Sequence, residues 1–238
     1  MKNPFVRPER KARNIERTVK HIRDYNVKKR ILTVALASLV TLLGMFYIVA
    51  VLYKQSGSFT VSLDKFEMTK YGLSLSESRD MLYPSSYLNA VIDEDITNIS
   101  EDKIPADVDN IDGVHNGDDY IAYTFYLQNA GEATVSYEYT LYINNVTQNL
   151  DGAIRTRLYV DGEYTTYAKT RTDGKGAEKG TKEFYSADVI EKRRVEEFKP
   201  GDVAKFTVVI WIEGNDPDCT DWLIGGQVHI EMGISIIH

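Results

Sequence analysis

Hydrophobic and polar side chains alternate at every second position through much of the second half of the chain. In residues 133–143, Val135, Tyr137, Tyr139 and Leu141 lie on one face of an extended chain, and mostly polar side chains lie on the other. A period of two is typical of a β-strand that buries one face. The same pattern recurs, with varying regularity, at 58–63, 73–76, 120–127, 204–212 and 227–237.

Turn sequences separate these predicted strands. Asp161-Gly162 accepts the positive φ angles of a two-residue turn and predicts a hairpin over 157–167. No long segment after residue 54 has a helical pattern, and 185–197 is the candidate for a short helix. Roughly seven or eight strands with polar outer faces predict an all-β fold, an antiparallel β-sandwich of immunoglobulin-like or jelly-roll type.

Residues 31–53 form an apolar run of a different kind, with no charged residue in 23 positions. At about 1.5 Å per residue, such a helix measures roughly 34 Å and crosses a bilayer core of about 30 Å. The hydroxyls of Thr33, Ser38 and Thr41 can bond back to helix carbonyls. A signal peptide has an apolar region of about 7–15 residues that ends in a small-x-small site. The length of this run and the lack of such a site favour an uncleaved transmembrane helix.

The charge distribution predicts the orientation of that helix. Residues 1–30 contain eleven Lys/Arg and three Asp/Glu, whereas the remainder contains 17 basic and 32 acidic residues. Positively charged flanks stay in the cytoplasm, so we expect a basic cytosolic segment over 1–30 and an extracellular domain over 54–238. The basic segment favours a helix that contacts lipid, or it serves only as a topology signal, and the bilayer is an expected partner. Nucleic acid would need more base-stacking rings than Tyr25 in 9–30.

Two segments of the extracellular domain lack strand alternation. Residues 92–119 hold ten carboxylates and one Lys, and residues 169–184 are rich in Gly and Lys. We predict an acidic loop over the first segment and a flexible loop over the second. Glycine and charged side chains offer little surface to bury, which is the physical reason for both predictions.

The stretch 211–219, WIEGNDPDC, contains the single Cys of the chain. Cys219 would need a nearby His to act as a nucleophile, and the predicted strands place none beside it. The histidines are His21, His115, His229 and His238. The chain also lacks the Gly-x-Ser-x-Gly, His-Glu-x-x-His and phosphate-loop motifs. We predict that the protein is not an enzyme, that Trp211 points outward, and that the stretch is an exposed connection between two strands.

Calcium is the one metal that the sequence suggests, because hard cations take six to eight oxygen ligands. Four carboxylates follow strand 204–212: Glu213, Asp216, Asp218 and Asp221. The alternative is that these carboxylates are simply solvated. Residues 107–113 fail as an EF-hand loop, since Ile111 and Asp112 occupy the positions of a ligand and of the glycine. Zinc ligands at the usual spacing are missing, and no other cofactor is expected.

Short motifs around the predicted strands carry one resemblance. They are Gly57–Asp64 after the hydrophobic segment, NAG at Asn129–Gly131 and KPGD at Lys199–Asp202. This layout resembles the exported all-β surface proteins of Gram-positive bacteria related to TasA and camelysin. The resemblance implies a jelly-roll domain that assembles by donating strands between subunits. The chain departs from that family in lacking a clear cleavage site. The single Cys excludes an intrachain disulfide, which fits a Gram-positive surface.

Together these features predict a single-pass protein of the cell membrane that is non-catalytic. Its β-sandwich would bind another protein, the cell wall or copies of itself, since binding modules need sheet edges and loops but no catalytic groups. One alternative is an exported fibre or matrix subunit released by signal cleavage. A surface hydrolase is another.

Overall fold

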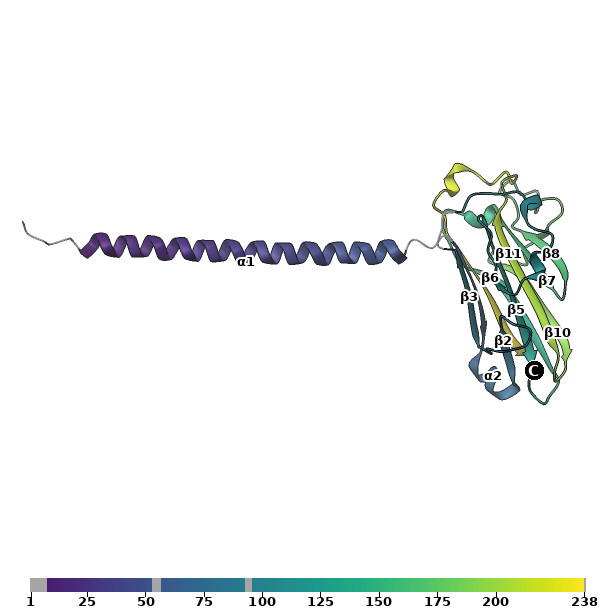
Figure 1. Cartoon of the computed structure of the whole chain (residues 1–238). Coiled ribbons are helices and arrows are strands. Elements are labelled where there is room, and N and C mark those ends of the chain that lie inside the picture. Colours follow the sequence, from purple (N-terminus) through teal and green to yellow (C-terminus); the bar gives the residue numbers. More distant parts are fainter. Residues whose placement is uncertain (1–7, 53–56, 93–95, 238) are drawn as a thin grey trace, which may run out of the picture. The chain divides into compact units, whose positions relative to one another are not determined.

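The computed structural model describes residues 8–52, 57–92 and 96–237. It divides into a helical unit, Met1–Tyr53, and a β-rich unit, Lys54–His238 (Figure 1). This division coincides with the end of the apolar run in the sequence.

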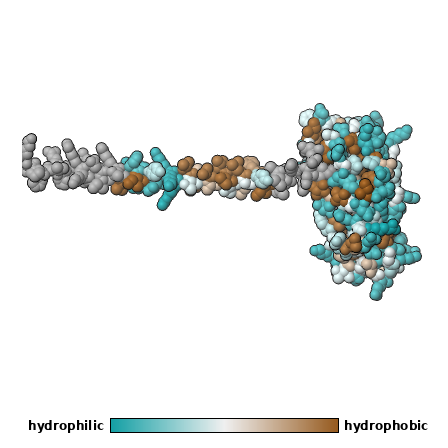
Figure 2. Space-filling view, in the orientation of Figure 1, coloured by the Kyte–Doolittle hydropathy of each residue, from teal (hydrophilic) through white to brown (hydrophobic). Residues whose placement is uncertain are grey.

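One uninterrupted helix, α1 (Pro8–Leu52), includes the basic residues 8–30 and most of the apolar run. Within it, Val19–Ile48 is long and apolar enough to cross a membrane. Thr33, Ser38 and Thr41 donate hydrogen bonds to carbonyls three or four residues earlier, at 2.8–2.9 Å, as the sequence predicts. Apolar side chains form a hydrophobic band along the helix (Figure 2). The helix fits a membrane anchor or a signal sequence.

The β-rich unit is a sandwich of two sheets, which confirms the predicted fold class. Sheet A contains, in spatial order, β10 (Val189–Phe198), β6 (Val135–Val146), β12 (Val228–Ile237), β1 (Gly57–Leu63) and β3 (Tyr87–Ile92). Sheet B contains β2 (Leu73–Ser76), β5 (Tyr120–Asn129), β11 (Val203–Ile212), β7 (Ile154–Val160), β8 (Glu163–Ala168) and β9 (Lys182–Glu183), and β4 (Gly113–Val114) also pairs with β5. The pairs β1–β12 and β8–β9 are parallel and the others are antiparallel, so both sheets are mixed.

Apolar side chains from the facing sides of the two sheets form the main core. Phe125 on β5 and Phe206 on β11 stack with ring centroids 5.2 Å apart, and Tyr139 from sheet A meets Phe206 edge-on at 5.3 Å. Such aromatic pairs contribute about 0.5–1.5 kcal/mol beyond their area burial. The hydrophobic positions of the alternating segments are therefore the buried ones, as the sequence predicts.

Strand β1 lies inside sheet A although it is the first strand of the chain. It pairs in parallel with β12, with Gly57 beside Val228, and it pairs antiparallel with β3 on its other side. Phe59 and Val61 have no exposed surface. Residues 53–56 alone separate β1 from α1, so the strand links the helical unit directly to the middle of a sheet.

Local turn chemistry fixes two connections. In the β7–β8 hairpin, Asp161 and Gly162 have φ angles of 52° and 90°, as a type I′ turn requires. Helix α2 (Lys65–Tyr71) begins after Asp64, whose carboxylate accepts a hydrogen bond from the Phe66 amide at 2.7 Å, and it ends at Gly72 in the left-handed conformation. With seven residues, α2 is too short to leave a periodic pattern in the sequence.

The short helix predicted for 185–197 is wrong. Residues 189–198 are strand β10, which pairs with β6 along the edge of sheet A. The segment is rich in Glu, Lys and Arg, which favour helices in isolation. Pairing with a neighbouring strand overrides that preference, and the charges suit an exposed edge because they discourage pairing with another chain.

The acidic segment 96–119, here called the covering segment, packs on the outer face of sheet B. It contains the 3₁₀ turns η1 (Glu101–Lys103) and η2 (Val108–Asn110) and strand β4. Ile104 and Val108 form a second, smaller core with Trp211. Asp109 pairs with Lys205 at 3.2 Å, so carboxylates of this segment also contact the sheet.

Trp211 is consequently buried, and its predicted exposure is wrong. The side chain does lie on the face of β11 away from the main core, as alternation predicts, but only 1% of it is exposed. A strand pattern identifies the two faces of a strand. It does not reveal that a distant segment covers the second face. The strand pattern therefore cannot predict that Trp211 is buried.

Ile104→Ala is expected to lower the free energy of unfolding of the 54–238 domain by about 2–5 kcal/mol, because it leaves a cavity under the covering segment. The native side chain is 7% exposed. Ile111→Ala, in the same segment but 50% exposed, is the matched control and should change stability by less than about 0.5 kcal/mol. Urea denaturation measures both variants, and equal small effects would contradict the packing.

Candidate functional site

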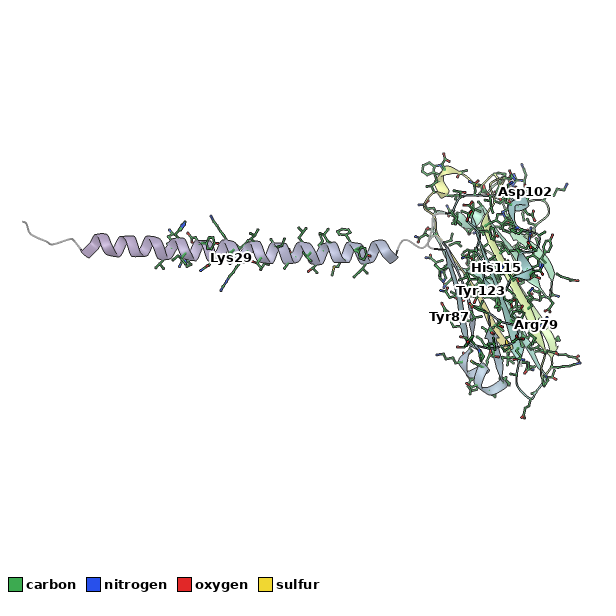
Figure 3. The ribbon with its side chains drawn as sticks, in the orientation of Figure 1. Lys29, Arg79, Tyr87, Asp102, His115 and Tyr123 are labelled. Carbon is green, nitrogen blue, oxygen red and sulfur yellow. The ribbon has the colours of Figure 1, made fainter. Side chains whose placement is uncertain are left out.

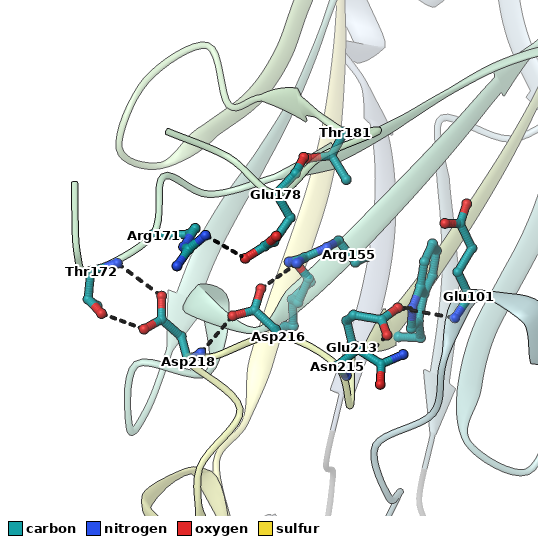
Figure 4. A network of polar contacts seen from close by, with 12 residues as sticks. Glu101, Arg155, Arg171, Thr172, Glu178, Thr181, Glu213, Asn215, Asp216 and Asp218 are labelled. Atoms are coloured by element: carbon teal, nitrogen blue, oxygen red, sulfur yellow. Dashed lines mark hydrogen bonds and ion pairs between the residues drawn. The ribbon is translucent and has the colours of Figure 1, made fainter. Parts of the chain in front are cut away.

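The connection from β11 to β12, residues 213–227, contains the polar residues that the sequence singles out. Pairing of β11 with β7 places Arg155 beside Trp211 on the outer face of sheet B, and Arg157 beside Val209. The two arginines are only 3% and 7% exposed. Buried charges need partners inside the protein. The connection and the covering segment supply them (Figure 4).

Asp216 forms a buried ion pair with Arg155. Its Oδ2 accepts a hydrogen bond from Arg155 Nη2, and the two side chains are 2% and 3% exposed. Its Oδ1 accepts a hydrogen bond from the Asp218 amide at 2.7 Å. The Asp216 carbonyl accepts a further bond from the Cys219 amide at 2.9 Å. These contacts hold the connection against sheet B.

Glu213 joins β11, the connection and the covering segment. Its Oε2 accepts hydrogen bonds from Trp211 Nε1 at 3.0 Å and from the Glu101 amide at 3.1 Å. Its Oε1 accepts one from the Asn215 amide at 3.2 Å. Glu101 in turn forms an ion pair with Arg157. Both carboxylate oxygens of Glu213 therefore accept hydrogen bonds from donors within the protein.

Asp218 and Asp221 lie outside that pairing. Asp218 accepts hydrogen bonds from the hydroxyl of Thr172 and from its amide, the latter at 3.0 Å. The bond from the Thr172 hydroxyl lowers the pKa of the Asp218 carboxyl, against the opposing effect of burial. Thr172 belongs to the predicted flexible loop 169–184, so this contact attaches that loop to the connection. Asp221 begins the 3₁₀ turn η4 (Asp221–Leu223) and is exposed.

Three of the four predicted calcium ligands, Glu213, Asp216 and Asp218, bind separate partners within the protein, and Asp221 is exposed. In the part of the chain that the structure describes, no group of three or more His, Cys, Asp or Glu side chains is arranged to hold a metal ion. Calcium would have to displace Arg155 from Asp216 and the amide donors from Glu213. The calcium hypothesis thus rests on the sequence alone and stays a prediction.

Cys219 is a half-buried free thiol that lines a cavity. Burial raises the pKa of this thiol, and the nearby carboxylates of Asp216 and Glu213 raise it further. The thiolate is the nucleophile in cysteine chemistry, so a raised pKa is the opposite of what a catalytic cysteine requires. That Cys219 has no activating base stays a prediction.

Ser58 and His229 are far apart in the sequence, but they form a hydroxyl–imidazole pair in the structure. The parallel pairing of β1 with β12 places them side by side, and Ser58 Oγ is hydrogen-bonded to His229 Nδ1. Ser58 is only 3% exposed. A nucleophilic serine needs an accessible oxygen and a base oriented by a third group, and this pair shows neither among the described contacts. That the protein is not an enzyme stays a prediction.

Two cavities flank the connection. One, of about 190 Å³, is polar, and its walls include Arg155, Asp216 and Glu213, which are already paired with one another or with neighbours. The other, of about 460 Å³, has walls in which apolar side chains lie beside polar ones such as Asn98 and Asp221. These walls include Ile96, Leu150, Ile212, Leu223 and Ile224. The polar residues that line the first cavity therefore serve mainly to hold the connection in place.

Two short stretches of the β-sandwich domain carry strongly exposed apolar side chains close together in the sequence. The first, called the distal patch, consists of Leu82, Tyr83 and Tyr87, which are 66%, 84% and 56% exposed. Tyr87 begins β3 and is labelled in Figure 3. The second, called the tip, consists of Trp222 and Ile224, which are 87% and 76% exposed.

The register of sheet A separates the two surfaces. Tyr87 pairs with Ser62, near the end of β1, whereas Gly57 at the start of β1 pairs with Val228, just after the tip. The patch and the tip therefore lie toward opposite ends of β1. Neither surface shows in the strand pattern, because both lie in connections or at a strand end.

No family model matches the chain, and no curated protein matches it. Solved structures with some likeness include a beta-glucosidase from Kluyveromyces marxianus in complex with glucose, at 12% identity and a TM-score of 0.25 over 70% of this chain. Another is the GH31 alpha-xylosidase from Xanthomonas citri, at 8% identity and a TM-score of 0.24 over 69% of this chain. The chain spans 15% and 16% of the length of those proteins, and the likeness is too low to carry an argument about fold or activity.

Asp216→Ala is expected to lower the free energy of unfolding by about 3–5 kcal/mol, because it leaves the Arg155 guanidinium buried without a partner. Asp221→Ala, at the exposed end of the same connection, is the control and should have an effect within about 0.5 kcal/mol. A double variant with Arg155→Met and Asp216→Leu should recover most of the loss. Urea denaturation measures all three. A mild Asp216→Ala phenotype would show that the pair is not buried in solution.

Saturating calcium is expected to leave the melting midpoint of the 54–238 domain unchanged. A ligand that binds only the native state raises the midpoint, and here the carboxylates already have protein donors. Differential scanning fluorimetry with calcium, with magnesium as the control ion, measures the shift. A calcium-specific rise that Asp216→Ala abolishes would establish a site at the connection.

Proposed function

We propose that the protein is a single-pass membrane protein whose β-sandwich domain faces outward and binds a partner protein through the distal patch. The observation that carries the proposal is the combination of a spanning-length apolar helix with an exposed cluster of Leu82, Tyr83 and Tyr87 at the far end of β1. The basic flank of α1 supports a cytoplasmic N-terminus, since positive flanks stay inside.

The chemistry of the distal patch supports a protein as the partner. Tyrosine combines a large apolar ring with a hydroxyl, and it is enriched at the centre of protein interfaces. Tyr83 is 84% exposed and Leu82 is 66% exposed, so the isolated domain leaves both largely in water. Gathered exposed apolar side chains of this kind mark interaction sites more often than isolated ones do.

The position of the distal patch also supports that role. Six residue steps along β1 separate Gly57 from Leu63, or roughly 20 Å at about 3.3 Å per step. The patch therefore lies well away from the point where the domain joins its anchor.

Four alternative functions make different forecasts. Self-association through the patch predicts dimers of the 54–238 domain in solution. Release as a fibre or matrix subunit predicts a mature N-terminus after about residue 53, which mass spectrometry of the cellular protein would show. Binding of a cell-wall ligand, or turnover of a hydrolase substrate, would not depend on Tyr83.

The orientation is tested with single cysteines in a Cys219→Ser background. Lys103→Cys, in the covering segment, should react with a membrane-impermeant maleimide on intact cells. Lys20→Cys, on the basic part of α1, should react only after detergent opens the membrane. Both positions are exposed in the structure, so access depends on the membrane alone. Labelling of Lys20→Cys on intact cells, or protection of Lys103→Cys, would contradict the proposed topology.

The distal patch is tested with a photo-crosslinking residue at position 83 in intact cells. We expect it to capture one protein partner, while the same residue at position 185 captures little. Tyr185 is a matched control, because it is also a solvent-exposed tyrosine, at 67%. Leu82→Ser with Tyr83→Ser should weaken binding at least about tenfold, or 1.4 kcal/mol, without changing the melting midpoint. Unchanged affinity would place the binding surface elsewhere.

A further inference from the structure

We propose that the tip, Trp222 and Ile224, inserts into the lipid headgroup region of the membrane that α1 spans. The proposal rests on the proposed function in one respect, that α1 is an uncleaved anchor. It adds a second contact with the bilayer, made by the β-sandwich domain itself.

The exposure of the tip is the first argument. Trp222 is 87% exposed, whereas Trp211, the other tryptophan, is 1% exposed. Ile224 is 76% exposed and lies two positions from Trp222. A tryptophan and an isoleucine that both face water from one short turn form a concentrated apolar surface.

The backbone presents these side chains on a defined turn. The Leu223 amide donates to the Thr220 carbonyl at 3.0 Å, and the Gly226 amide donates to the Leu223 carbonyl at 2.8 Å. Leu223, between the two tip residues, packs against the main core. The side chain of Leu223 thus anchors the turn η4, and its neighbours on either side remain largely exposed to solvent.

The covalent path to the helix is the second argument. Gly57 pairs with Val228, and Val228 is four residues after Ile224. Four residues span at most about 14 Å, so the tip stays close to Gly57. Five residue steps link Leu52, the end of α1, to Gly57, and they span at most about 18 Å. If α1 is embedded, the tip is therefore tethered near the bilayer surface.

The chemistry of the tip selects lipid as the occupant. Tryptophan concentrates at membrane–water interfaces, because its ring is apolar and its N–H remains in reach of water and headgroups. Charge attraction is not the driving force, since Asp221 is the charged residue of η4 and the chain after residue 30 is acidic. Insertion should therefore occur in zwitterionic lipid and should not require basic residues or low salt.

Brominated lipids test this directly, because bromine in the acyl chains quenches nearby indole fluorescence. The full-length chain is reconstituted into phosphatidylcholine vesicles with and without bromine, and Trp222→Phe is measured beside the native protein. We expect bromine to quench the native emission and the Trp222→Phe protein to lose that quenching. Trp211 should contribute little, since it is buried in the domain. Ile224→Ser should reduce quenching, while Tyr185→Ser, a substitution at another exposed position, should not.

Flotation of the same vesicles separates the two proposals. Protein that floats and shows quenching dependent on Trp222 supports the tip. Protein that floats with equal emission in brominated and plain lipid overturns the tip proposal and leaves the anchor intact, as expected if the tip instead binds a protein. Protein that does not float overturns both. Raising the salt concentration should leave the quenching unchanged, and its loss in high salt would contradict an apolar contact.

Discussion

The parallel pairing of β1 with β12 is the constraint on which the rest of this structure depends. It places the first strand of the domain between the last strand and β3, with Phe59 and Val61 fully buried in the main core. If β1 left the sheet, β3 would lose its hydrogen-bonding partner and the core would lose three buried side chains, those of Phe59, Val61 and Leu63. Because the pair also joins Gly57 to Val228, it determines which loops lie at the anchored end of the domain.

The buried ion pairs of the domain lie on the outer face of sheet B. Arg155 and Arg157 project from β7 on that face, and the covering segment and the 213–227 connection enclose them. Buried guanidinium groups are costly unless they are paired, and Asp216 and Glu101 provide the pairs. Of the four carboxylates that suggest calcium in the sequence, Asp216 is therefore the counter-charge of a buried arginine, and Glu213 accepts hydrogen bonds from Trp211 and from two backbone amides.

The sequence predicts the strands well because burial on one face leaves a period of two, as in β6, where the side chains from Val135 to Ile143 alternate as expected. It predicts the apolar helix equally well, since length and charge suffice. It fails at β10, where charged residues conceal an edge strand, and at Trp211, where burial comes from a segment about a hundred residues earlier. Strand order, and with it the contact of Ser58 with His229, depends on pairing between distant segments that no local pattern records.

The distal patch and the tip, likewise, are located by strand pairing and not by a local sequence pattern. Tyr83 and Trp222 are ordinary residues of connections in the sequence, and only the register of sheet A places them toward opposite ends of the domain. One end joins the helix and presents the tip, and the other presents the distal patch. The proposed roles, a lipid contact at one end and a protein contact at the other, both follow from the position of β1.

Hydrogen–deuterium exchange of the 54–238 domain tests that position most directly. Amides in the interior of a sheet exchange only through global unfolding, whereas amides of a loosely attached strand exchange through local opening. The account predicts that the amides of Phe59 and Val61 exchange as slowly as those of Ile230 and Met232 in β12, with which β1 pairs. Fast exchange in β1 while β12 stays protected would contradict it, and would show that the first strand is not part of the folded sheet.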